Sequence, residues 1–193
     1  EDPYELELLI SYGTSKGGSA GHLALAIRDA RADDDWVYSA NFYADGDPKH
    51  AKERYVDELM VRIPKKEDLF GTTSTLSDKA SFGLDYGEIY KRSVVGVRVY
   101  GVPAREKEAL AAYFARINDD FRNNARNTEY HHGEIRYDYL RLNCAKTIAA
   151  GFKYGAGYRD LDIDSAGLLS GIRLAAALNA NIPTEMALEL MQQ

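Results

Sequence analysis

The alternation of apolar and polar positions predicts a series of strands in the first hundred residues. The segments Glu5–Tyr12 (ELELLISY) and Tyr55–Ile63 (YVDELMVRI) each read as a strand. In His22–Arg28 (HLALAIR), positions 22, 24 and 26 share one face, while the leucines and the isoleucine share the other. Trp36–Tyr43 (WVYSANFY) follows an acidic turn and is expected to form a hairpin with the strand before it. The β-branched segment Tyr90–Tyr100 indicates a further strand, in the centre of the sheet.

Helical spacing dominates the second half of the chain. Pro103 stands where a helix can begin, and Ala104–Arg126 carries apolar residues three and four positions apart. A second helix is predicted to start near Cys144, and the tail predicts two more, after Asp164 and after Pro183. Strands followed by helices indicate the α+β class, with an antiparallel sheet packed against helices.

Size and composition fit one globular domain. The chain has 193 residues, of which 45% are hydrophobic and 28% charged, enough to bury a core. We expect a single domain over residues 1–193, with residues 160–193 forming a C-terminal helical appendage. The net charge of −6 and the dispersed lysines and arginines argue against a nucleic-acid partner, and the apolar runs are too short for a transmembrane segment. The oligomeric state stays open.

The only cysteine, Cys144, is the candidate nucleophile. One thiol excludes an internal disulfide, and with four scattered histidines it predicts neither a metal site nor a cofactor. At the start of a helix, directly after Asn143, the sulfur would meet unpaired N–H groups and the positive end of the helix dipole. Both lower a thiol pKa that is about 8.5 in free cysteine. Position alone is equally consistent with a buried cysteine acting as a small hydrophobe.

His22 is the candidate base. It opens a predicted strand whose face otherwise carries only alanine, which would leave room for the helix of Cys144 to approach. The glycine-rich loop that ends at Gly21 indicates an open cleft beside it. A histidine satisfied within a packed core is the alternative interpretation.

A third residue is needed to hold the imidazole in the right tautomer. The strand after His22 offers Tyr38, Ser39 and Asn41. Asn41 is preferred because its amide oxygen can accept the ring N–H, and Asp45 is held in reserve.

Several neighbours of the proposed pair are expected to contact the substrate or stabilise an oxyanion. The backbone N–H at Cys144 is the first oxyanion donor. Tyr137 and Tyr139 precede it on a short lead-in, where a hydroxyl can donate to the oxyanion, although core packing is an equal alternative. The expected substrate and oxyanion residues are Asn143, Tyr139, Tyr137 and Gly21.

The order of these residues resembles the circularly permuted branch of the papain-like, NlpC-type thiol enzymes, in which the histidine strand precedes the cysteine helix. More narrowly, the chain resembles the bacterial DUF4105 family, the Lnb-type lipoprotein N-acyltransferase domain. The resemblance rests on five segments that span roughly residues 8–155 in the same order: SAGHLALAIRD, YSANFY, FGLDYG, YKRS and YLRLNCA.

The resemblance implies a permuted papain-like catalytic domain with Cys144 as nucleophile, His22 as base and a thioester intermediate. The expected activity is that of a cysteine hydrolase (a peptidase or amidase) or of an acyltransferase, acting on a peptide, protein or acyl-bearing substrate. The family also implies a location in the bacterial cell envelope (periplasm) or secretion. The short, acidic chain without a lipid-facing helix argues against a lipoprotein substrate.

Two rival functions remain at this point. The first is the transfer of fatty acyl groups by the same centre, which requires an apolar acyl channel. The second is a non-catalytic binding or interaction module, in which Cys144 and His22 are ordinary core residues.

Overall fold

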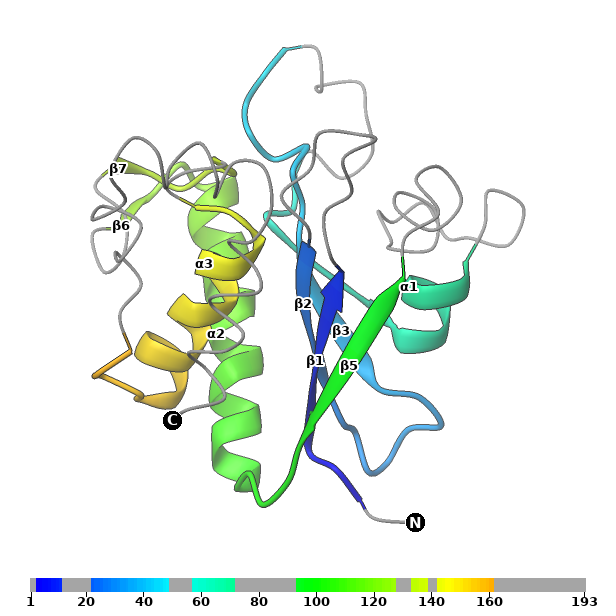
Figure 1. The fold of residues 1–193 in the computed structure, drawn as a ribbon. Coiled ribbons are helices and arrows are strands. Elements are labelled where there is room, and N and C mark those ends of the chain that lie inside the picture. The colour runs from blue at the N-terminus through cyan, green and yellow to red at the C-terminus, as the bar shows by residue number, and fades with distance from the viewer. Residues whose placement is uncertain are drawn as a thin grey trace, which may run out of the picture.

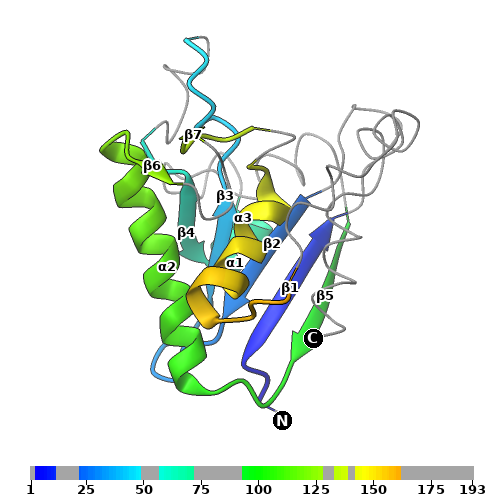
Figure 2. The ribbon, with the colours of Figure 1, turned by 90° about the vertical axis from the view of Figure 1, so that its left-hand side faces the viewer.

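A computed structural model of the chain shows a five-stranded sheet between two layers of helix. In Figure 1, α2 and α3 lie on one side of the sheet and α1 on the other, and Figure 2 views the sheet through α2 and α3. The structure describes residues 3–11, 22–48, 57–71, 93–127, 133–138 and 142–161.

The strands of the sheet are all antiparallel to their neighbours and lie in the order β4-β3-β2-β1-β5. They are β1 (Leu6–Ser11), β2 (His22–Ile27), β3 (Trp36–Ala40), β4 (Met60–Pro64) and β5 (Val94–Val99). The predicted hairpin is confirmed, because β2 pairs with β3. A two-residue ladder, β6 (Arg126–Asn127) with β7 (Gly133–Glu134), stands apart from the sheet.

The expected central position of the strand over residues 90–100 is wrong. Its described part, β5, is an edge strand that pairs with β1 alone among the described strands. The residues of β5 are exposed or only partly buried. β-branched residues are favoured wherever side chains pack on a pleated, half-buried surface. An edge strand offers such a surface as well as a central strand does, so the sequence does not distinguish the two positions.

The helices are α1 (Lys65–Phe70), α2 (Ala104–Arg122) and α3 (Cys144–Ala150), which runs on through the π-helical turns of η3 (Gly151–Ala156). The starts of α2 and α3 agree with the predictions from Pro103 and Cys144. Helix α1 was not predicted from the sequence. A helix of six residues is too short to display a helical period.

The two faces of the sheet carry different apolar layers. Leu23, Leu25 and Ile27 of β2 belong to the larger core, which includes α2 and α3. Ala24 and Ala26 belong to a smaller core under α1. The members of that smaller core are Leu9, Ala24, Ala26, Val37 and Ile63, with Leu69 and Val94 packed against them.

Close packing of α2 against η3 depends on two glycines. A Cβ atom at Gly151 would lie 2.7 Å from two ring atoms of Phe114, and one at Gly155 would lie 2.8 Å from Cβ of Tyr113. Since η3 continues α3 without a break, these contacts also fix where α3 begins, and therefore where Cys144 lies.

The α+β class and the antiparallel sheet packed against helices are confirmed, whereas the permuted papain-like architecture stays a prediction. The single-domain interpretation likewise stays a prediction. The helices expected after Asp164 and Pro183, and nearly all of the appendage over residues 160–193, lie outside the described residues. In the part of the chain that is described, no helix combines the length and the apolar character needed to cross a bilayer.

Candidate active site

Cys144 is the first residue of α3, as predicted, and Asn143 caps the helix. The Asn143 side-chain oxygen accepts a hydrogen bond from the Lys146 N–H at 2.9 Å, the usual role of asparagine at a helix start. The Thr147 hydroxyl donates to the carbonyl oxygen of Asn143 at 2.8 Å. The capping bond occupies the amide oxygen of Asn143, and its expected contact with a substrate stays a prediction.

The Cys144 sulfur is almost completely buried, with 4% of the residue exposed. Burial raises the pKa of the thiol, because a thiolate loses its hydration there. Hydrogen bonds from the backbone of Leu23, Ala145 and Cys144 itself, and from the Tyr137 side chain, lower the pKa without cancelling the effect of burial. The resting form at neutral pH is therefore the protonated thiol, held at the start of β2 by its contact with Leu23.

His22 is also buried, but its side chain belongs to the other face of the sheet. It shares that face with Ala24 and Ala26, whereas the next residue, Leu23, lies in the core that contains Cys144. The ring nitrogen Nε2 lies 2.7 Å from the Ser39 hydroxyl. The structure thus brings Cys144 to the backbone of β2 directly after His22, with the imidazole directed to the opposite face.

The expectation that the alanine face would receive the helix of Cys144 is wrong. Helix α3 packs on the leucine face, and the alanine face packs beneath Leu69 of α1. The physical reason is the apolar area available for burial. The leucines of β2 offer α2 and α3 much more of it than Ala24 and Ala26 do, and hydrophobic stabilisation scales with that area.

A row of buried polar residues surrounds His22. Ser11 of β1 lies directly opposite His22 in the strand register, and its hydroxyl has no hydrogen-bond partner among the residues that are described. Continuing the register of β2 and β3 by two residues places Asn41 opposite His22 on the other side. Ser11, His22 and Ser39 therefore form a polar cluster at this end of the sheet, and Asn41 directly follows the last residue of β3 nearby.

The side-chain amide of Asn41 is engaged with the backbone. Its Nδ2 donates to the carbonyl oxygen of Glu58 at 3.0 Å, and its Oδ1 accepts from the N–H of Tyr43 at 3.1 Å. The role of Asn41 as the residue that orients His22 stays a prediction, and Ser39 joins it as a residue bonded to the ring. The reserve residue Asp45 accepts the N–H of Asp47 in a turn.

Tyr137 is placed where the sequence suggested, beside the thiol. Its N–H donates to the carbonyl oxygen of Ala44 at 2.6 Å, which ties the lead-in of α3 to the chain that follows β3. Its side chain hydrogen-bonds Cys144. Gly21 and Tyr139 lie outside the described residues.

Sequence reasoning missed Ser11 as a member of the His22 cluster. The available signal was weak: a single polar residue that ends an apolar strand, whose position opposite His22 depends on the register.

Within the described ranges, no three or more histidine, cysteine, aspartate or glutamate side chains are grouped as a metal site.

Comparisons with other proteins add no relative. No family model matches the chain, and neither the curated proteins nor the solved structures give a significant match. The resemblance to the DUF4105 and NlpC-type enzymes therefore stays a prediction, and function has to be argued from the site itself.

Proposed function

We propose that the chain is a cysteine-dependent acyl-transfer enzyme in which Cys144 forms a thioester intermediate. One observation carries the proposal: Cys144 is the first residue of the capped helix α3, where hydrogen-bond donors act to lower the pKa of its thiol, although burial raises that pKa more. The donors come from three backbone positions and from the Tyr137 side chain. Donors in such an arrangement stabilise negative charge on the sulfur and on the oxygen of a bound carbonyl.

In the proposed mechanism His22 accepts the proton of Cys144. The sulfur then forms a bond to the acyl carbon, and the leaving group departs with the proton returned by the imidazolium. Water or an amine attacks the thioester next, which gives hydrolysis or transfer and restores the thiol. For the first proton transfer the imidazole has to reach the sulfur around the start of β2, while Ser39 and Asn41 are the residues available to orient it.

The class of substrate follows from the resemblance rather than from the geometry. It consists of a peptide, a protein or another acyl-bearing molecule, handled by a permuted papain-like domain in the bacterial envelope or outside the cell. The support for the architecture is the antiparallel sheet, with the helix of the cysteine packed against the strand that His22 begins.

A second candidate function, a non-catalytic binding or interaction module, is favoured by a different observation. Cys144 is buried with a raised pKa, and the His22 side chain lies on the other face of the sheet, bonded to Ser39. In that case both residues are ordinary members of the core, and no movement of the imidazole is required.

The test uses p-nitrophenyl acetate as an acyl donor and intact-protein mass spectrometry as the readout. Because Cys144 is the only cysteine, an acyl adduct removed by hydroxylamine and absent from Cys144→Ala identifies the nucleophile. We expect His22→Ala to slow acylation by several orders of magnitude, as in other triads. Tyr137→Phe keeps the ring and removes one donor, so it should slow acylation to a smaller extent.

The proposal fails if no adduct forms, or if Cys144→Ala releases nitrophenol as fast as the wild type. Thermal unfolding of each variant, followed by circular dichroism, separates loss of the chemistry from loss of the fold.

A further inference from the structure

The two edges of the sheet, β4 and β5, differ in how they are protected (Figure 2). At the β4 edge, the Asn118 side chain bonds both the N–H and the carbonyl oxygen of Met60, and Pro64 has no N–H to offer. Among the described residues, the backbone of β5 bonds only β1 and Glu5, which directly precedes β1. An edge of this kind presents unpaired N–H and C=O groups with which another strand can pair.

The β5 edge also carries exposed apolar side chains. None of the residues of β5 is buried. Val95 is 46% exposed, and Tyr100, which directly follows the strand, is 52% exposed. Within the described ranges, Phe70 is the only other large apolar side chain that is exposed. An exposed apolar edge strand is a surface suited to pairing with a further strand.

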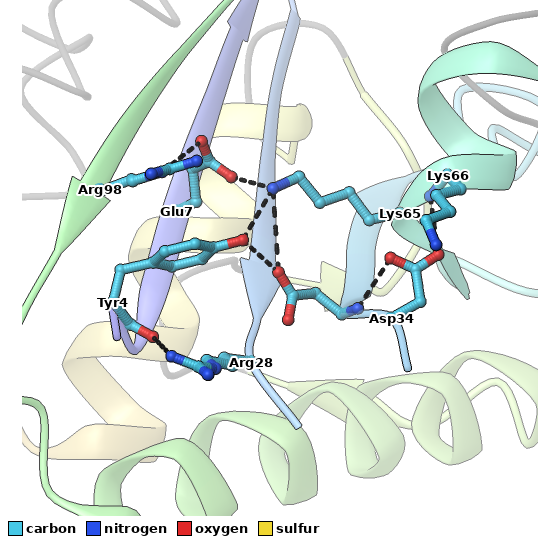
Figure 3. A network of polar contacts seen from close by, with 8 residues as sticks. Tyr4, Glu7, Arg28, Asp34, Lys65, Lys66 and Arg98 are labelled. Carbon is cyan, nitrogen blue, oxygen red and sulfur yellow. Dashed lines mark hydrogen bonds and ion pairs between the residues drawn. The ribbon is translucent and has the colours of Figure 1, made fainter. Parts of the chain in front are cut away.

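A pair of opposite charges lies beside this edge, on the α1 face of the sheet (Figure 3). Glu7 stands opposite Arg98 in the register of β1 and β5, with 3.6 Å between Oε1 of Glu7 and Nε of Arg98. The other carboxylate oxygen of Glu7 pairs with Lys65. The Glu7 side chain also lies over Gly96, because a Cβ atom at that glycine would be 3.0 Å from Cδ of Glu7. At Gly96, therefore, no β5 side chain stands between the Glu7 carboxylate and the edge.

We propose that two copies of the chain pair antiparallel through their β5 edges, with Val97 of each copy opposite Val97 of the other. Positions 94, 96 and 98 lie on the α1 face of β5, and positions 95, 97 and 99 lie on the other face. A twofold axis at Val97, perpendicular to the sheet, keeps each face on its own side. The result is one continuous sheet of ten strands, five from each copy.

Complementary charges select this register. It places Arg98 of each copy opposite Gly96 of the other, beside the second copy's Glu7 carboxylate. The side chain of Arg98 is 53% exposed, and a guanidinium group has five N–H donors, enough to contact Glu7 of both copies. Shifting the strands by two positions in one direction places Arg98 opposite Val94, without an acceptor. Shifting them in the other direction places the two Arg98 side chains opposite each other, where like charges repel.

The same register covers both exposed apolar side chains. Val95 comes to lie opposite Val99 of the second copy, and Tyr100 opposite Val94. Pairs of β-branched residues, and of an aromatic with a β-branched residue, stabilise neighbouring strands. Two six-residue edges bury less area than a standard interface, so we expect a reversible dimer with a dissociation constant of about 10–100 µM. The dimer does not depend on a catalytic role of Cys144.

The first experiment is sedimentation velocity of the full chain over about 1–500 µM, a range that brackets the expected dissociation constant. Val95→Lys should leave only monomer, because a lysine on an edge strand opposes pairing. Ala115→Lys is the matched control, since it adds the same charge at an exposed position of α2. Circular dichroism checks that both variants stay folded.

A second pair of variants tests the contribution of charge. Arg98→Gln should raise the dissociation constant about tenfold, because each dimer loses two ion pairs between the copies. Within its own chain Glu7 keeps its pair with Lys65. Arg105→Gln removes an exposed arginine of α2 and should leave the dissociation constant unchanged.

Disulfide formation tests the register in the Cys144→Ala background, which contains no other cysteine. In the proposed dimer, the Cα atoms of the two Val97 residues are about 4.5–5.5 Å apart, within the range of a disulfide. The two Val95 residues are four positions apart along the strands, about 13 Å. Oxidation should therefore link Val97→Cys into a covalent dimer and leave Val95→Cys unlinked.

A monomer at every concentration would overturn the proposal and leave the β5 edge to a different partner. So would equal dimerisation of Val95→Lys and Ala115→Lys, or an equal effect of Arg98→Gln and Arg105→Gln. Covalent linkage of Val95→Cys in place of Val97→Cys would overturn the register, and with it the ion pairs between the two copies.

Discussion

The substitution of Gly96 in β5 by alanine tests how tightly the carboxylate of Glu7 is held by its ion pairs. A Cβ atom there would lie 3.0 Å from Cδ of Glu7 and closer still to Oε1. The Glu7 side chain is buried, and its carboxylate pairs with Lys65 and Arg98. We predict that Gly96→Ala forces this carboxylate out of place, because carbon atoms in contact normally stay at least 3.5 Å apart.

The magnitude follows from three contributions. Gly96 is exposed and the atoms that the new Cβ would meet are the far end of the Glu7 side chain, so overpacking costs about 1 kcal/mol, the low end of its range in cores. Disturbing the pair of Glu7 with the partly buried Lys65 adds to that cost, since loss of a partner in a buried pair is strongly destabilising. Alanine recovers about 0.5–1 kcal/mol relative to glycine within a strand. The expected net loss is about 1 kcal/mol in the free energy of unfolding, most of it from the disturbed Glu7–Lys65 pair.

Urea unfolding of Gly96→Ala, Glu7→Ala and the double variant measures this coupling. The three atoms nearest to the new Cβ all belong to Glu7 beyond its own Cβ, so Glu7→Ala removes them. In that background Gly96→Ala should be neutral or slightly stabilising. An equal loss of stability in both backgrounds would refute the argument, because the strain would then lie elsewhere in β5.

Three further predictions concern the packing around the sheet. Asn143→Ala should cost about 1 kcal/mol in urea unfolding through loss of the α3 cap, and Asn143→Asp should retain that stability; equal stability of all three proteins would contradict the capping role. The side-chain amide of Asn118 bonds both the N–H and the carbonyl oxygen of Met60 at 2.8 Å, on the edge strand β4. Asn118→Ala should therefore lower the free energy of unfolding by about 1–3 kcal/mol. It should also expose the edge of β4 and promote association, which light scattering would detect. Gly151→Ala should lower stability by about 1–3 kcal/mol through its clash with Phe114, and an unchanged unfolding midpoint would contradict the close contact.

The sequence predicted those parts of the fold that display a clear period. Strands β1, β2 and β3 are runs of five or six mostly apolar residues, and α2 repeats its apolar positions over 19 residues. Local pattern carries no information on strand order, which is why β5 was placed in the centre. Helix α1 is shorter than two turns, so its sequence cannot show a helical repeat of apolar residues.

The candidate site was predictable only in its local parts. The asparagine directly before Cys144 predicted a capped helix start, and the structure confirms it. The face of β2 on which α3 packs was not predictable, since residues 22–27 offer apolar side chains in both directions. Likewise the position of Ser11 opposite His22 is a matter of strand register, which depends on the assembled sheet.

The central claim is that His22 serves Cys144 as its base, and the pH dependence of cysteine alkylation tests it directly. The rate of reaction with iodoacetamide is measured by mass spectrometry for the wild type, His22→Ala and Ser39→Ala. With His22 as proton acceptor, alkylation of the wild type between about pH 7 and 8 exceeds that of His22→Ala at least about tenfold, although the raised pKa of the buried thiol makes both rates rise with pH. Identical profiles for wild type and His22→Ala, with the rate rising only above the ordinary pKa of a thiol, would contradict the claim and leave Cys144 as an inert core residue.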